Sequence, residues 1–177
     1  MATLIYETHS TSTDNELGLA SGWYDAELSD TGKRQAVDLG QRYEDVLLSA
    51  VYYSDQKRAI QTVGIAFRGV SFALIQDERL RECDYGYLTR NPNKIIGPSR
   101  HFYVSKPYPN GESYEQTTQR VRSFLGEIKA THKSGETILV IGNRAVQYGL
   151  EHCLKNRPLQ DVVRDKFVWQ AGWTYEL

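Results

Sequence analysis

The chain of 177 residues is predicted to be an α/β protein, in which helices pack against a sheet. Short apolar runs rich in β-branched residues alternate with longer segments whose apolar residues recur every three or four positions. With 40% hydrophobic and 24% charged residues, the chain can build one full core. A single domain over residues 1–177 is therefore expected.

Charge and composition exclude several functional classes. The formal net charge of -1 and the pI near 6.4 argue against a general nucleic-acid-binding protein, which would usually be basic. No apolar run is long enough to span a membrane, and the N-terminal residues lack the pattern of a secretion signal, so a cytoplasmic location is expected. The two cysteines, Cys83 and Cys153, are expected to be reduced structural thiols.

The first predicted strand, residues 3–6, leads into a polar segment and then a helix. The polar segment ETHSTSTDNE (7–16) surrounds His9 with short hydrogen-bonding side chains, which could hold an anion or simply form a loop. Ser29 can cap the helix that follows. Its buried face should carry apolar residues at spacings of three and four, namely Ala36, Leu39, Tyr43 and Leu47.

A second strand, helix and strand follow in the same order. Residues 50–53 and 72–75 predict the two strands, and Asp55 can cap the helix between them. The buried stripe of this helix should consist of Ala59, Ile60, Val63 and Phe67.

Residues 85–111 lack regular periodicity and predict an irregular, lid-like excursion over one end of the sheet. Four prolines interrupt any long element: Pro92, Pro98, Pro107 and Pro109. Between Thr89 and Gly111 there are two lysines, two arginines and no acid. This excursion is therefore a candidate lid for an anion, although a sugar phosphate, a nucleotide or a phosphoglycerate would suit it equally.

The last third of the chain again predicts regular elements. Ser113 and Gln116 form a Ser-x-x-Gln capping box at the start of a helix. Residues 137–141 form a continuous apolar run ending at Gly142, which is typical of a central parallel strand. A helix over 145–154 and a strand over 173–177 follow. Trp169 and Trp173 are expected to be core and edge aromatics.

Polar side chains follow the ends of the predicted parallel strands. These are His9, Arg58, Glu82 and Asn143. Because the carboxyl ends of parallel strands open onto one crevice, we expect these residues to share a pocket. An imidazole can attack phosphorus, a guanidinium can bind phosphoryl oxygens, and a carboxylic acid can protonate the leaving oxygen. The set suits phosphoryl transfer, although Glu82 could instead pair with Arg79 or Arg81.

Several ordered segments resemble the histidine phosphatase and phosphoglycerate mutase-like superfamily, over essentially the whole chain. THSTSTDN (8–15) stands where the family has Arg-His-Gly-Glu-Thr-x-x-Asn, and SDQKRAIQT (54–62) resembles Ser-Asp-Leu-x-Arg-Ala-x-Gln-Thr. SGWYDAELSDTGKRQA (21–36), RLRECDYG (79–86) and PNGESYEQ (109–116) resemble further signatures. ILVIGNRA (138–145) falls where Val-x-x-Gly-His is usual.

The resemblance implies a three-layer α/β/α sandwich around a mostly parallel sheet. It implies that His9 is the phosphorylated nucleophile and that Glu82 is the proton donor and later the base that activates water. Arg58 and Asn15 would bind phosphate, and Ser21 and Gly22 would line the substrate side. No cofactor is expected. No metal is expected either, because no close set of His, Asp and Glu has the spacing of metal ligands.

Two positions depart from the family pattern. The first pocket arginine is Thr8 here, and the second pocket histidine is Asn143. Both changes remove positive charge from the phosphate site, so activity could be reduced or absent. The Thr8 hydroxyl and the Asn143 amide can still donate hydrogen bonds, and Arg144 or basic residues of the excursion could restore charge.

Three functional hypotheses follow. The first is a phosphomonoesterase that acts on a small phosphorylated metabolite through a phosphohistidine at His9. The second is a mutase, suggested by SGWYDAELS (21–29), although the excursion is short and lacks an adjacent arginine pair. The third is a non-catalytic binder of a phosphate ligand, motivated by Thr8 and Asn143. In each case the expected partner is a small phosphomonoester, with no nucleic acid or membrane, and the oligomeric state is open.

Overall fold

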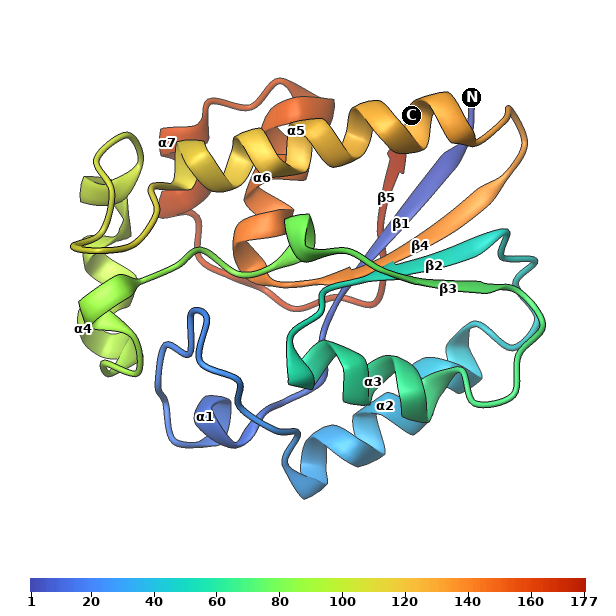
Figure 1. The fold of residues 1–177 in the computed structure, drawn as a ribbon, viewed down its shortest axis with the longest axis horizontal. Helices are drawn as coiled ribbons and strands as arrows, with labels where there is room; N and C mark the ends of the chain where they lie inside the picture. Colours follow the sequence, from blue (N-terminus) through green and yellow to red (C-terminus); the bar gives the residue numbers. More distant parts are fainter.

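The computed structural model describes residues 1–177 and contains a five-stranded sheet with the order β3-β2-β4-β1-β5 (Figure 1). The strands are β1 (Thr3–Thr8), β2 (Ala50–Tyr53), β3 (Ala73–Gln76), β4 (Thr137–Gly142) and β5 (Trp173–Glu176). The first four are parallel, and β5 pairs antiparallel with β1. Thr8 is paired with Gly142, and Tyr53 with Ile141, so the carboxyl ends of the three central strands lie at one edge.

Helices cover both faces of the sheet and make three layers (Figure 1). α2 (Asp30–Arg42) and α3 (Lys57–Ala66) lie on one face, and α5 (Tyr114–Thr131) and α6 (Arg144–Lys155) lie on the other. Alternate residues of the strands face the two layers. Tyr6 packs with the α5 and α6 side, whereas Leu139 packs with Leu39 and Val63 of α2 and α3. The predicted sandwich around a mostly parallel sheet is confirmed.

Three shorter helices lie near the carboxyl edge of the sheet (Figure 1). They are α1 (Thr13–Glu16), α4 (Asn93–Ser99) and α7 (Leu159–Arg164), and the sequence patterns predicted none of them. Residues 85–111 therefore contain α4 and two short 3-10 helices rather than an irregular chain alone. Buried Ile96 and Tyr108 pack with Tyr148 of α6, which fixes this excursion against the rest of the molecule.

The predicted helix starts are partly confirmed. The Ser29 hydroxyl accepts a hydrogen bond from Gly32 N, and both bonds of the Ser113–Gln116 capping box are present. The prediction that Asp55 caps the next helix is wrong. α3 begins after Gln56, because the carboxylate of Asp55 binds the guanidinium of Arg81 instead.

Two residues predicted to be buried lie outside the core. Leu47 is 91% exposed because α2 ends at Arg42, before the apolar pattern does. Ile60 is 41% exposed because it lies on the outer side of α3. None of the helices combines the length and the apolar character that crossing a lipid bilayer requires.

Candidate active site

The predicted site residues surround one cavity of about 800 Å³ at the carboxyl edge of the sheet. His9 directly follows β1, Asn143 directly follows β4, and Arg58 lies in the first turn of α3 after β2. The other predicted residues also line this cavity, namely Thr8, Asn15, Ser21, Gly22, Glu82 and Arg144. The structure therefore places these side chains around one pocket, as expected.

The imidazole of His9 is held in one tautomer. Its Nδ1 lies 2.7 Å from the carbonyl oxygen of Ser10, which can only accept, so Nδ1 carries the hydrogen. Nε2 therefore keeps its lone pair, which accepts a hydrogen bond from Nε of Arg58 at 3.2 Å. Burial and the neighbouring charge of Arg58 lower the pKa of His9 to about 3. His9 is consequently neutral near pH 7, and its Nε2 lone pair can act as a nucleophile once Arg58 turns its Nε–H to another acceptor.

Arg58 is only 1% exposed, and it donates to neutral oxygens and to Nε2 of His9. Its Nη2 lies 2.9 Å from the carbonyl oxygen of Gly22 and 2.9 Å from Oε1 of Gln56. Nη1 lies 3.0 Å from the carbonyl oxygen of Tyr24. No carboxylate lies within hydrogen-bond distance of the guanidinium, so its charge is available to an anion in the cavity.

Asn143 holds Arg58 through its side-chain oxygen. Oδ1 accepts from Nε of Arg58 at 3.1 Å and from Nη2 at 2.8 Å, while Nδ2 donates to the carbonyl oxygen of Leu80 at 3.0 Å. One of the two N–H groups of this amide is engaged by Leu80, so the expectation that Asn143 donates to a phosphate now depends on the other one. The Asn143 oxygen thus occupies two N–H groups of the Arg58 guanidinium.

Glu82 lies between the short 3-10 helices Glu78–Leu80 and Gly86–Leu88, in a segment with no strand or helix of its own. The residue is 9% exposed and lines the cavity. Oε1 accepts from the backbone nitrogens of Cys83 at 2.8 Å and Ala145 at 3.2 Å. The alternative pairing with Arg79 or Arg81 is absent, because Arg79 binds Asp77 and Glu127 and Arg81 binds Asp55. Oε2 therefore remains for a ligand.

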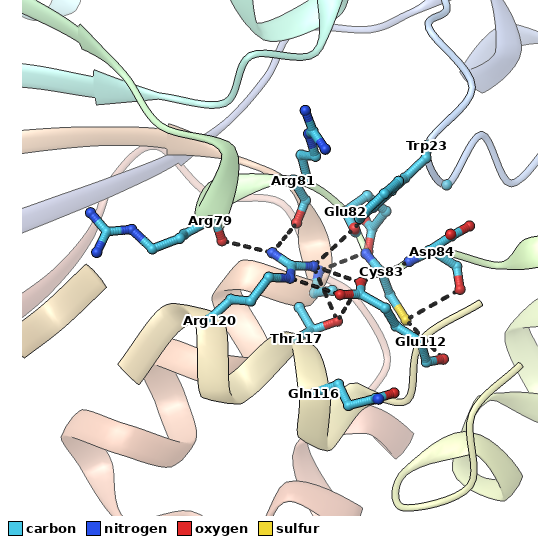
Figure 2. Close-up of polar contacts among 12 residues, drawn as sticks. Trp23, Arg79, Arg81, Glu82, Cys83, Asp84, Glu112, Gln116, Thr117 and Arg120 are labelled. Carbon is cyan, nitrogen blue, oxygen red and sulfur yellow. Dashed lines mark hydrogen bonds and ion pairs between the residues drawn. The ribbon is translucent and has the colours of Figure 1, made fainter. Parts of the chain in front are cut away.

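Figure 2 shows how side chains fix the backbone around Glu82. Arg120 of α5 donates to the carbonyl oxygens of Arg79 at 2.8 Å and Glu82 at 3.3 Å, and it binds both carboxylate oxygens of Glu112. On the other side, Nε1 of Trp23 donates to the Glu82 carbonyl at 2.7 Å. Sequence reasoning missed Arg120, Glu112 and Trp23; their only signal was that Glu112 and Trp23 lie in family-like segments.

Two arginines bring further positive charge to the cavity. Arg100, in the lid-like excursion, lines it without a hydrogen-bond partner in the chain. Arg144 donates through Nη2 to the carbonyl oxygen of Asp165 at 3.0 Å, and its guanidinium lies over the rings of Tyr148 and Phe167. The Nε atoms of both arginines are buried and unpaired. Both arginines thus line the same cavity as Thr8 and Asn143, and the restored charge stays a prediction.

The cavity also extends along α2, which the sequence did not indicate. Glu7 is 1% exposed and lies 3.1 Å from Nη2 of Arg42, and burial raises the pKa of Glu7. Trp169 is 56% exposed and lines this part of the cavity, so the expectation that it is a core or edge aromatic is wrong. The loop before β5 holds Trp169 outside the core, over Arg42.

These groups define a class of site. A neutral imidazole beside a buried guanidinium, with a carboxylate lining the same cavity, can bind a phosphoryl group and transfer it through nitrogen. Nowhere in the structure do three or more His, Cys, Asp or Glu side chains gather in a group that could hold a metal ion.

The chain belongs to the histidine phosphatase superfamily (branch 1), whose family model matches residues 8–169. It is 30% identical over 150 residues to a protein of Hydrogenobacter thermophilus named putative phosphoserine phosphatase 2, covering 80% of this chain and 74% of that protein. It is 32% identical over 167 residues to the 2,3-bisphosphoglycerate-dependent phosphoglycerate mutase of Cytophaga hutchinsonii, covering 85% of this chain and 78% of that protein.

Solved structures show the same fold. YhfR of Bacillus stearothermophilus superposes with a TM-score of 0.86 at 28% identity, covering 100% of this chain and 92% of that chain. A mycobacterial glucosyl-3-phosphoglycerate phosphatase superposes with a TM-score of 0.85 at 19% identity, covering 97% of this chain and 91% of that chain. The phosphoglycerate mutase-like fold expected from the sequence is therefore confirmed.

Proposed function

We propose that the protein is a phosphomonoesterase that acts on a small phosphorylated metabolite through a phosphohistidine at His9. The observation that carries this proposal is the neutral imidazole of His9, whose Nε2 lies 3.2 Å from Nε of buried Arg58. Membership of the histidine phosphatase superfamily supports it, and both phosphatases and mutases are among the relatives.

The first step transfers the phosphoryl group to His9. Arg58 binds phosphoryl oxygens, and Asn15 donates from Nδ2, since its Oδ1 already accepts from Ser12 N. Nε2 of His9 forms a bond to phosphorus while the bond between phosphorus and the leaving oxygen breaks. Glu82 gives its proton to that oxygen, and the alcohol leaves.

The second step returns the enzyme to its starting state. Water attacks the phosphorus of the phosphohistidine, and Glu82, now a carboxylate, takes a proton from this water. The bond between nitrogen and phosphorus breaks, inorganic phosphate leaves, and Nε2 of His9 regains its lone pair. Substrate-side residues Ser21 and Gly22 line the cavity beside the leaving group.

Arg100 and Arg144 provide charge that Thr8 and Asn143 do not. An unpaired guanidinium nitrogen that is cut off from water is unfavourable, and an anionic ligand would satisfy it. This favours substrates whose leaving group carries a second anionic group, such as a carboxylate, within reach of Arg100. The proposed substrate class is thus a small phosphomonoester with at least one further negative charge.

The two alternatives each retain one supporting observation. The mutase relative keeps phosphoryl transfer between hydroxyls as a second candidate. The contact of Asn143 Oδ1 with Nε and Nη2 of Arg58 keeps a non-catalytic binder as a third, because it occupies donors that a phosphoryl group needs.

A phosphatase assay with 4-nitrophenyl phosphate, run beside a mutase assay with a phosphoglycerate, separates the three. The proposal expects release of inorganic phosphate by the wild-type protein and none by His9→Ala. Isomerisation without net phosphate release would favour the mutase. Phosphate binding by calorimetry without either reaction would favour the binder.

A further inference from the structure

Gln56 stands where the family pattern Ser-Asp-Leu-x-Arg-Ala has a leucine, and its amide hydrogen-bonds three residues that line the cavity: Arg58, Glu82 and Gly22. It occupies the N-cap position of α3, yet its side chain makes no capping hydrogen bond. The residue is only 5% exposed. Buried polar groups almost always have hydrogen-bond partners, so this amide should have partners other than the N-terminus of its own helix.

The amide of Gln56 connects three parts of the site. Its Oε1 accepts from Nη2 of Arg58 at 2.9 Å and from the backbone nitrogen of Glu82 at 3.0 Å. Its Nε2 donates to the carbonyl oxygen of Gly22 at 2.9 Å, which also accepts from Nη2 of Arg58 at 2.9 Å. One side chain therefore joins the proposed phosphate ligand, the substrate-side loop and the backbone of the proposed proton donor.

The position of Glu82 depends on such contacts. The residue belongs to no strand or helix, so no ladder of backbone hydrogen bonds fixes it. Its backbone N–H is directed to Gln56 Oε1, and a leucine at position 56 would remove that acceptor. Because proton transfer requires the acid within hydrogen-bond reach of the leaving oxygen, a small displacement of Glu82 would slow it.

We propose that Gln56 is a positioning residue that couples phosphoryl binding by Arg58 to leaving-group protonation by Glu82. Both N–H groups share one oxygen, so the orientation that suits Arg58 also sets the backbone of Glu82. This inference rests on the proposed function, since it needs Glu82 to act as the proton donor.

The test compares two leaving groups in Gln56→Leu, which introduces the leucine of the family pattern. 4-Nitrophenyl phosphate has a leaving group that departs with little protonation, whereas a primary alkyl phosphate requires the acid. The ratio kcat/KM reports the transfer of the phosphoryl group to the enzyme. We expect kcat/KM to fall about tenfold more for the alkyl ester than for the nitrophenyl ester.

Gln61→Leu is the matched control. Gln61 lies on the same helix, and its Oε1 also accepts from one backbone nitrogen, that of Leu28, at 2.7 Å. Its side chain has no hydrogen bond with Arg58 or Glu82, so the leaving-group ratio of Gln61→Leu should equal that of the wild type even if its melting temperature falls. Gln56→Met, which keeps the length and loses the acceptor, should reproduce the altered ratio if Gln56→Leu does not fold.

Gln56→Glu separates the two connections. A carboxylate at this position still accepts from Glu82 N, although it no longer donates to the carbonyl oxygen of Gly22, so the leaving-group ratio should stay near the wild-type value. Its negative charge beside Arg58 should raise KM severalfold for both esters.

The role of Gln56 would be overturned if kcat/KM fell equally for the two esters in Gln56→Leu and Gln56→Met. It would also be overturned if Gln61→Leu changed the ratio of the two kcat/KM values as Gln56→Leu does. Neither result would affect the proposed function. A wild-type protein that hydrolyses neither ester would instead overturn the proposed function, and the inference with it.

Discussion

Asn143→His should raise turnover, because the side-chain oxygen of Asn143 occupies two N–H groups of Arg58 that a phosphoryl group could use. These contacts are 3.1 Å from Nε and 2.8 Å from Nη2. Replacing the amide by an imidazole removes that oxygen and places an N–H donor at the end of β4, where the family pattern has histidine.

The magnitude follows from these two contacts. A guanidinium N–H that donates to an anionic phosphoryl oxygen instead of a neutral amide oxygen gains about 1 kcal/mol, because both partners are then charged. Redirecting two N–H groups of Arg58 to phosphoryl oxygens is therefore worth about 2 kcal/mol. Because 1.4 kcal/mol corresponds to about a factor of ten, the expected gain is about thirtyfold. It should appear mainly in kcat, since charge-assisted donors act most strongly on the transition state.

The assay is steady-state hydrolysis of several phosphomonoesters by the wild type, Asn143→His and Asn143→Ala, with melting curves to establish folding. Asn143→Ala frees Arg58 without adding a donor, so it should gain less than Asn143→His. The reasoning is refuted if Asn143→His folds normally yet no ester is turned over faster, with His9→Ala equally inactive. The non-catalytic binder would then be favoured.

Other predictions concern His9, Arg100 and the pair of Glu7 and Arg42. Burial and Arg58 hold the pKa of folded His9 at about 3, against 6.5 for an unperturbed imidazole, so between these pH values only the unfolded chain binds the proton. The free energy of unfolding, measured in urea, should therefore fall more steeply with decreasing pH in the wild type than in His9→Gln, and parallel curves would contradict this. Arg100→Gln should lower kcat/KM for a phosphomonoester bearing a carboxylate about tenfold more than for 4-nitrophenyl phosphate; equal losses would remove its proposed role. Arg42→Ala leaves the buried Glu7 carboxylate without its cation and should lower the free energy of unfolding by about 3 kcal/mol in urea denaturation, whereas an unchanged midpoint would contradict the buried pair.

The meeting of His9, Arg58 and Asn143 was predictable because the ends of parallel strands are fixed by topology. β1 and β4 are neighbours in register, so residues just after them must be close. The capping box at Ser113 was predictable for a similar reason, since both of its bonds are local in sequence.

What the sequence did not predict depends on contacts between distant segments. The amide of Asn143 turns its oxygen to Arg58 because Leu80, far away in sequence, accepts from its nitrogen. Asp55 fails to cap α3 because Arg81 binds it. Local sequence patterns show neither the orientation of the Asn143 amide nor the partner of Asp55.

Helix length was misjudged where charge and apolar spacing disagree. The apolar pattern of α2 continues to Leu47, but Glu44 and Asp45 follow the end of the helix at Arg42. Acidic residues are unfavourable at a helix C-terminus, so the helix ends before the pattern does.

The proposed phosphohistidine is tested most directly by brief exposure of the protein to a phosphomonoester carrying labelled phosphate, followed by denaturation and peptide mapping. Retained label should be stable in base and lost in acid, and it should map to the peptide containing His9. It should be absent from His9→Ala and should accumulate when Glu82→Gln slows hydrolysis of the intermediate. Label on a serine or a cysteine, or label that persists in His9→Ala, would contradict the account.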